Sequence, residues 1–244
     1  MFQNEIESYL ERNGFETFNP KAVLFDMDGV LFNSMPLHAR SWRKAMAAFG
    51  VEMTEAEAYK YEGMRGVETI RILCRRQWGR EISDKEAEDM YAVKSGMFAA
   101  QPEAGKMEGA ESLMRAIRND GLRICVVTGS GQHTLLDRLS YAFPGLVESQ
   151  LIVTAFDVTR GKPAPDPYVA GLRKCGVQPW EAIVVENAPL GVQAAVAARI
   201  FTVAVNTGPL PDYMLREKGA DVVCRTINEL YEKWPNLKRG QEAI

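Results

Sequence analysis

Short apolar runs alternate with segments of helical periodicity along most of the chain. Apolar runs of strand length lie at residues 22–25, 122–127, 151–154, 182–185, 201–205 and 221–224. Segments with helical spacing follow at residues 110–119, 133–141, 167–175, 189–198, 212–218 and 227–234. Strands that alternate with helices indicate βαβ units, and continuous apolar strands indicate a parallel sheet covered on both faces. We therefore predict an α/β fold with a doubly wound, Rossmann-like parallel sheet.

This alternation is interrupted between residues 33 and 101, where no segment has the pattern of a strand. Helical spacing predicts four helices there, at residues 36–49, 54–61, 67–78 and 84–100. The second begins with a capping-box sequence, Thr54-Glu-Ala-Glu57. We predict an all-helical cap domain over residues 34–101, inserted into a core domain made of residues 19–33 and 102–244.

Two further local predictions concern helix ends. Residues 1–18 have the pattern of one accessory helix that ends at Gly14 and packs on the outside of the core. Pro167 suits the first position of a helix, and Asp166 is the expected cap before it.

The first apolar run ends in Asp26-Met-Asp28-Gly29. Residues i and i+2 of an extended chain point to the same side, so both carboxylates face the same space. Carboxylates held this close repel, and a divalent cation, a shared proton or a lysine must compensate. A lone pair of this kind is also typical of a solvated turn, so the other strand ends decide between the two interpretations.

Three other strand ends also carry polar groups. Thr128-Gly-Ser-Gly131 lies between a strand and a helix, where N–H groups and hydroxyls hold phosphate, although Ser130 also suits a helix cap. Lys162 precedes a proline and has a charge that would balance the acids. Glu186-Asn187 offers oxygen ligands for Mg²⁺ or, alternatively, a helix cap. Because parallel strands share one carboxyl edge, all four groups are expected to meet in one cleft.

Composition excludes several classes of function. The 244 residues are 46% hydrophobic and 25% charged, with net charge −3, which is ordinary for a globular protein. There is no dense Lys/Arg stripe for nucleic acid, no apolar run long enough to span a membrane, and no signal-peptide pattern at the start. Four cysteines without a CxxC pair, and two histidines, indicate a reduced cytoplasmic protein without a zinc site. We expect a monomer.

Four motifs in order carry a family resemblance. DMDGV (26–30), Thr128 in VVTGS, Lys162 in GKPAPDPY and Glu186-Asn187 in VENAPLG resemble the four motifs of the haloacid dehalogenase superfamily of phosphotransferases. The likeness spans residues 21 to about 225 and is strongest to the β-phosphoglucomutase-like subgroup. This subgroup also contains sugar-phosphate phosphatases and some inorganic pyrophosphatases. The resemblance implies Mg²⁺-dependent phosphoryl transfer on a small phosphorylated substrate.

The resemblance also implies a role for each motif residue. Asp26 would be the nucleophile that becomes an aspartyl phosphate, and Asp28 would protonate the leaving group and then activate water. Thr128 and Lys162 would hold the phosphoryl oxygens, beside Gly129 and Ser130 in the same loop. Mg²⁺ would be bound by Asp26, the carbonyl of Asp28 and position 187, with Glu186 close behind.

The sequence departs from the family pattern in two places. Motif four usually ends in a second acid, where this chain has Asn187, and the amide should weaken metal binding. Position 33, at the start of the cap linker, is Asn where the subgroup commonly has Asp.

Three cap residues are candidates for substrate binding. Glu62 would contact the leaving group or a metal-bound water, and Arg65 would contact a second phosphate or a hydroxyl. A solvated turn is the alternative for both. His38 aligns with a histidine that assists catalysis in the mutases, although its position four residues before Trp42 also suits a packed side chain.

We predict a hydrolase that acts on inorganic pyrophosphate or a small phosphoester. The first alternative is a β-phosphoglucomutase, which needs a second phosphate-binding site for its bisphosphate intermediate. Arg65 could bind the second phosphate, but Glu62, three residues away, would repel it. A catalytically silent phosphosugar-binding module is an alternative of another class, because Asn187 is atypical. The sequence disfavours a signalling receiver domain, since the phosphorylated Asp of a receiver ends the third strand and no helical block follows its first strand.

Overall fold

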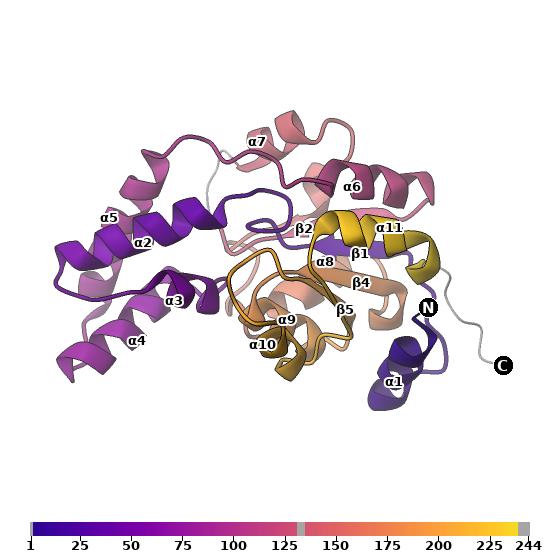
Figure 1. Ribbon diagram of the computed structural model, residues 1–244, viewed down its shortest axis with the longest axis horizontal. Helices are drawn as coiled ribbons and strands as arrows, with labels where there is room; N and C mark the ends of the chain where they lie inside the picture. Colours follow the sequence, from indigo (N-terminus) through magenta and orange to yellow (C-terminus); the bar gives the residue numbers. More distant parts are fainter. Residues whose placement is uncertain (1, 131–134, 239–244) are drawn as a thin grey trace.

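Six parallel strands form one sheet in the computed structural model, which describes residues 2–130 and 135–238. The strand order is β3-β2-β1-β4-β5-β6, and Figure 1 labels its central strands β2, β1, β4 and β5. The strands are β1 (Ala22–Phe25), β2 (Arg123–Val127), β3 (Ile152–Val153), β4 (Ala182–Glu186), β5 (Phe201–Val205) and β6 (Val222–Cys224). β1 therefore lies in the middle of the sheet, flanked by β2 and β4. The predicted doubly wound parallel sheet is confirmed.

Helices cover both faces of the sheet because the side chains of each strand alternate. Val23 and Phe25 pack in one cluster with α6 (Ala110–Asn119), α7 (Leu135–Ala142) and α11 (Ile227–Leu237). Ala22 and Leu24 pack on the other face with α8 (Asp166–Cys175) and α9 (Pro189–Ala197), and α10 (Asp212–Glu217) packs beside α9. Short 3₁₀ turns, η1 (Ser149–Leu151) and η2 (Pro179–Glu181), precede β3 and β4. Two buried faces explain why the strands read as unbroken apolar runs.

The insert after β1 is helical and has a hydrophobic core of its own. It consists of α2 (Met35–Ala48), α3 (Glu55–Lys60), α4 (Gly66–Trp78) and α5 (Asp84–Ala99), grouped at one end of the molecule (Figure 1). The predicted capping box at Thr54 and Glu57 is present, and Ser83 with Glu86 forms a second one. The helical cap is confirmed, while its boundaries at residues 34 and 101 stay a prediction.

Helix α1 (Gln3–Asn13) lies at the opposite end of the molecule from the cap (Figure 1). Gly14 ends it in the left-handed conformation, as the sequence predicts. The Tyr9 hydroxyl donates to the carbonyls of Pro179 and Arg199, at 3.2 and 2.9 Å, and its ring meets Phe201 edge-on. These contacts join α1 to the amino ends of β4 and β5, away from the carboxyl ends of the strands.

One helix start differs from its prediction. Helix α8 includes Asp166, is preceded by Pro165, and has no side-chain cap. The Asp166 carboxylate instead accepts two hydrogen bonds from the Arg160 guanidinium, at 3.1 and 3.0 Å, so the predicted cap at Asp166 is wrong. The predicted start of the preceding helix at His133 lies outside the described residues. Within residues 2–130 and 135–238, no helix is both long and apolar enough to cross a membrane.

Replacement of Tyr9 by Phe should reduce stability without reducing activity. The substitution removes the one O–H donor that two partly buried carbonyls share, and losing the partner of a buried polar group costs about 1–3 kcal/mol. Urea denaturation should show a free energy of unfolding lower by about 1–2 kcal/mol, with kcat/KM unchanged. A fall in kcat/KM of the folded variant would show instead that α1 influences the active site.

Candidate active site

The end of the central strand supplies the first two acids of the site. The N–H of Asp26 still bonds to the Val185 carbonyl at 3.0 Å, so its position is fixed by the sheet. Gly29 then turns the chain with φ of 85°, and a Cβ there would lie 2.1 Å from the Asn187 amide nitrogen. A side chain at position 29 would therefore separate the first motif from the fourth.

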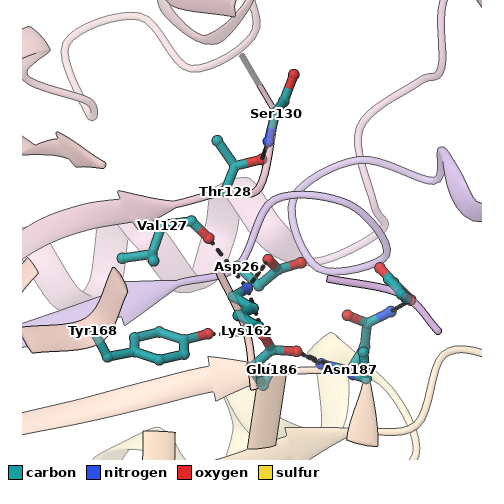
Figure 2. Close-up of polar contacts among 10 residues, drawn as sticks. Asp26, Val127, Thr128, Ser130, Lys162, Tyr168, Glu186 and Asn187 are labelled. Atoms are coloured by element: carbon teal, nitrogen blue, oxygen red, sulfur yellow. Dashed lines mark hydrogen bonds and ion pairs between the residues drawn. The ribbon is translucent and has the colours of Figure 1, made fainter. Parts of the chain in front are cut away.

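The Lys162 ammonium contacts residues at the carboxyl ends of three strands, β1, β2 and β4 (Figure 2). Its ammonium forms an ion pair with Asp26, lies 2.7 Å from Glu186 Oε1 and 3.4 Å from the Val127 carbonyl. The side chain is almost completely buried. Burial alone would lower the pKa of Lys162, but the two carboxylates outweigh it and raise the pKa, so the ammonium stays charged. Lys162 therefore supplies a permanent positive charge beside Asp26.

Glu186 fixes this lysine and the turn that carries Asn187. Its Oε1 accepts from Lys162 and from the Tyr168 hydroxyl, at 2.7 and 2.8 Å. Its Oε2 accepts the N–H groups of Asn187 and Ala188, at 2.8 and 3.0 Å. Both oxygens thus have two donors each, and Glu186 stands behind the site, as the sequence placed it.

The loop after β2 lies above Asp26 (Figure 2). Thr128 is buried, and its hydroxyl oxygen accepts the N–H of Ser130 at 3.1 Å. Gly129 and Ser130 line the same cavity as both acids, so the structure brings the predicted phosphate loop to the predicted nucleophile. The small side chains leave the backbone of this loop open to a ligand.

Asp28 is surrounded by groups that stabilise its ionised form. The Ser34 hydroxyl donates to its Oδ1 at 2.5 Å, and His38 Nε2 lies 3.4 Å from the same oxygen. Burial raises the pKa of Asp28, but His38 and these hydrogen bonds outweigh it and lower the pKa to about 2. His38 therefore belongs to the site, and it is also packed, with its ring stacked on Phe98 at 3.9 Å.

Lys94, which the sequence analysis missed, fixes the orientation of His38. It is buried on α5, and its Nζ lies 2.8 Å from His38 Nδ1 and about 5 Å above the rings of Trp42 and Phe98. Burial lowers the pKa of Lys94 to about 8, so at pH 7 it is still an ammonium with donors alone. His38 Nδ1 must then accept, and Nε2 carries the proton that faces Asp28.

The cap loop brings Glu62 to the core site. The Asn187 amide donates to Glu62 Oε2 at 3.1 Å. Glu62 Oε1 and Asn187 Oδ1 are both buried and have no hydrogen-bond partner within the described part of the chain. Arg65 points elsewhere, because its guanidinium donates to the Thr159 carbonyl at 3.4 Å. Glu62 is thus in the site, while Arg65 contacts a core loop beside it.

Negative charge exceeds positive charge around these residues. Burial raises the pKa of Asp26 to about 7, with Lys162 opposing and Glu186 and Asp28 adding to the increase. Burial and the same acids, Asp26 first, raise the pKa of Glu62 far above its usual range. A divalent cation would relieve this repulsion.

The donor set fits Mg²⁺, which takes oxygen ligands and few carboxylates. Asp26, the Asp28 carbonyl and the unpartnered amide oxygen of Asn187 are such ligands, and the free oxygen of Glu62 lies beside them. No cluster of three His, Cys, Asp or Glu side chains forms a metal site by itself in residues 2–130 and 135–238.

A cavity of about 120 Å³ lies between cap and core. Pockets for drug-sized ligands measure about 300–1,000 Å³, so this cavity suits a compact molecule. Two cationic side chains, Lys94 and Arg138, line this cavity. The predicted site residues that line it are Asp26, Asp28, His38, Glu62, Thr128, Gly129 and Ser130.

Known proteins resemble this chain in sequence and structure. The family described as haloacid dehalogenase-like hydrolase matches residues 20–199. Hexitol phosphatase A of Escherichia coli is 31% identical over 88% of this chain and 96% of its own length. Validoxylamine A 7'-phosphate phosphatase of Streptomyces hygroscopicus is 29% identical over 89% of this chain and 98% of its own length. A solved structure of a candidate beta-phosphoglucomutase from Bacteroides vulgatus is 48% identical, with TM-score 0.93, and the match covers 97% of this chain and 96% of that one.

The chain belongs to the haloacid dehalogenase-like hydrolase family, in its β-phosphoglucomutase-like subgroup. It is an enzyme of phosphoryl transfer, a phosphatase or phosphotransferase for small phosphorylated molecules.

Replacement of Asp26 by Asn should abolish turnover. An amide cannot form the aspartyl phosphate, and the Lys162 ammonium would keep Glu186 as its partner, so the fold should survive. Phosphate release should fall to background while circular dichroism stays unchanged. Retention of a substantial fraction of the wild-type kcat would disprove Asp26 as nucleophile.

Replacement of Lys94 by Met should lower kcat about tenfold, part of the 10²–10⁴-fold that acid–base catalysis contributes. Methionine fills the apolar space without a buried charge, but His38 loses the donor that fixes its tautomer. KM should change little, and the pH dependence of kcat should shift. Lys85→Met, at an exposed position of the same helix, is the matched control. An unchanged kcat and pH profile would show that Lys94 has a packing role alone.

Proposed function

We propose that this enzyme is a Mg²⁺-dependent phosphohydrolase for a compact substrate, with inorganic pyrophosphate or a small phosphoester as the candidates. One observation carries the proposal: the cap inserts the carboxylate of Glu62 beside Asn187, with one oxygen of each side chain buried and unpartnered. Such oxygens have the chemistry to bind a divalent cation, or a protonated leaving phosphate.

The core residues divide the reaction between them. An oxygen of Asp26 attacks phosphorus, the bond from phosphorus to the leaving oxygen breaks, and Asp28 gives that oxygen a proton. Asp28 then takes a proton from water as the water oxygen attacks the aspartyl phosphate, which regenerates Asp26 and releases phosphate. Thr128 and Lys162 hold the phosphoryl oxygens throughout.

The neighbours of Asp28 stabilise its ionised form, which suits its task as a base, and for its task as an acid Asp28 must enter the reaction protonated. The chain Lys94–His38–Asp28 keeps a ring N–H directed at the Asp28 carboxylate after its proton has left. Mg²⁺, bound by Asp26, the Asp28 carbonyl and Asn187, would neutralise charge on the nucleophile and the phosphoryl group.

Size and charge favour a compact anionic leaving group. The cavity of about 120 Å³ is small for a hexose bisphosphate, which a mutase must hold and turn over. Arg138 lines its wall, and its guanidinium is suited to bind a leaving phosphate. The sequence placed the cap's positive charge at Arg65, whose guanidinium instead bonds to the Thr159 carbonyl.

A panel of substrates with Mg²⁺ tests this function, and Glu62→Gln tests the residue that carries it. Phosphate release should be fastest from pyrophosphate or a small phosphoester. Glu62→Gln should lower kcat/KM on the preferred substrate by about 10–100-fold, the usual effect of altering a group that supports a bound metal. Glu68→Gln, on the exposed side of the cap, is the control.

The mutase alternative has its own arm in this experiment. The enzyme is incubated with β-glucose 1-phosphate, Mg²⁺ and a trace of the 1,6-bisphosphate. If glucose 6-phosphate accumulates faster than phosphate is released from every compound of the panel, the enzyme is a mutase. If no compound turns over, it is a silent phosphosugar-binding module.

A further inference from the structure

The loop that carries Glu62 is held against the core on both sides, three residues before Glu62 and three residues after it. On one side, the ring of Tyr59 lies on Gly208, where an added Cβ would stand 2.7 Å from a ring carbon. On the other side, Arg65 Cγ lies 3.2 Å from the place of a Cβ at Gly161, and its guanidinium bonds to the Thr159 carbonyl. We call these two contacts the Tyr59 seat and the Arg65 seat.

The core side of the Tyr59 seat is a braced loop. The Asn206 amide donates to the Leu210 carbonyl at 2.8 Å, which closes the loop around Gly208. The neighbouring Thr207 hydroxyl donates to the Gly29 carbonyl at 2.7 Å, in the turn that follows both acids. Leu210 also packs against the hydrophobic core of the cap. This seat therefore ties the cap to the turn that positions Asp28.

The core side of the Arg65 seat is braced in the same way. Asp157 accepts from the N–H and hydroxyl of Thr154, at 2.7 and 2.8 Å, and pairs with Lys174 at 2.7 Å. The chain then passes through Thr159 and Gly161 directly into Lys162. A cap residue thus rests on the segment that holds the lysine beside Asp26.

Within the described residues, the hydrogen bond from Asn187 is the one side-chain hydrogen bond that Glu62 makes at the site, and its Oε1 has no partner. The position of Glu62 therefore depends on how the loop that carries it rests on the core. The two seats lie on either side of Glu62, and both use a glycine to let a cap side chain approach the core backbone.

We propose that Tyr59 and Arg65 are positioning residues that hold Glu62 in the site and thereby select compact substrates. With both seats closed, the space between cap and core stays small. A bulky phosphoester must lift the loop from its seats, which withdraws Glu62. This inference rests on the proposed hydrolase function and adds to it the contacts that set its substrate size.

Three variants open the seats without touching the catalytic groups. Arg65→Ala removes one seat from the cap side. Gly208→Ala inserts a methyl group under Tyr59, and Gly161→Ala inserts one under Arg65, at positions whose backbone is not in the left-handed region. Arg65→Lys keeps an aliphatic stem and a donor. Arg75→Ala, which breaks an exposed cap ion pair with Glu81, is the control.

The first measurement needs no substrate. Hydrogen–deuterium exchange of the intact protein should be faster by about three- to tenfold over residues 61–66 in Arg65→Ala and Gly208→Ala, the range expected for one lost hydrogen bond or contact. Arg65→Lys should restore most of the protection, and Arg75→Ala should match the wild type. Unchanged exchange in Arg65→Ala and Gly208→Ala would overturn the seats, whatever the enzyme hydrolyses.

The second measurement concerns selectivity. The ratio of kcat/KM for pyrophosphate to that for p-nitrophenyl phosphate should fall about three- to tenfold in the same two variants. Gly161→Ala should lower this ratio in the wild-type background. In the Arg65→Ala background it should have no effect, because the added methyl group meets no side chain there. Faster exchange with an unchanged ratio would overturn the selection of substrates. A Glu62→Gln variant with full activity would overturn the proposed function instead, and the exchange result would still decide the seats.

Discussion

The whole site depends on one buried ammonium shared by two carboxylates. Lys162 lies between Asp26 and Glu186, and an unpaired charge at any of these three positions would be costly in so dry a place. Each residue comes from a different part of the chain. The ion pairs are satisfied when the end of β1, the end of β4 and the loop before α8 are all correctly placed. The same contacts that neutralise the charges therefore define the geometry of the nucleophile.

The support for this ammonium extends outward through hydrogen bonds. Glu186 receives a bond from Tyr168 on α8 and from two N–H groups at the start of α9. Asn187 is held in turn, and through it the cap residue Glu62. Charge compensation in the core and closure of the cap are thus parts of one connected network, in which the cap adds a further negative group. A bound cation is the physical complement of that excess.

The sequence was sufficient to predict the site residues that lie at the ends of strands. Asp26, Thr128 and Asn187 each follow an apolar strand, and parallel strands bring their ends together, so their meeting was predictable. Lys94 was not, because a lone lysine on a charged helix has the pattern of a solvated face. The predicted helix N-cap at Asp166 was wrong because the guanidinium of Arg160, six residues earlier, binds the Asp166 carboxylate.

The direction of the cap side chains was also beyond sequence reasoning. Glu62 and Arg65 were equal candidates for the cleft, since both lie in one short loop. The structure separates them by the packing of cap on core, in which Glu62 meets Asn187 and Arg65 meets Thr159. Such contacts between distant segments depend on how the cap domain packs against the core domain, and no local sequence pattern predicts this packing.

The position of β1 in the sheet has a consequence for biosynthesis. Ala22 pairs with Arg123 on one side and with Ala182 on the other, so the strand that carries the nucleophile waits for partners from far along the chain. Closing such long loops is entropically costly, and it is slow. The cap, whose four helices are contiguous and share a core, is complete long before that and shortens the first loop. On a ribosome the substrate-selecting cap would fold first, and the chemistry would appear after β4 has emerged.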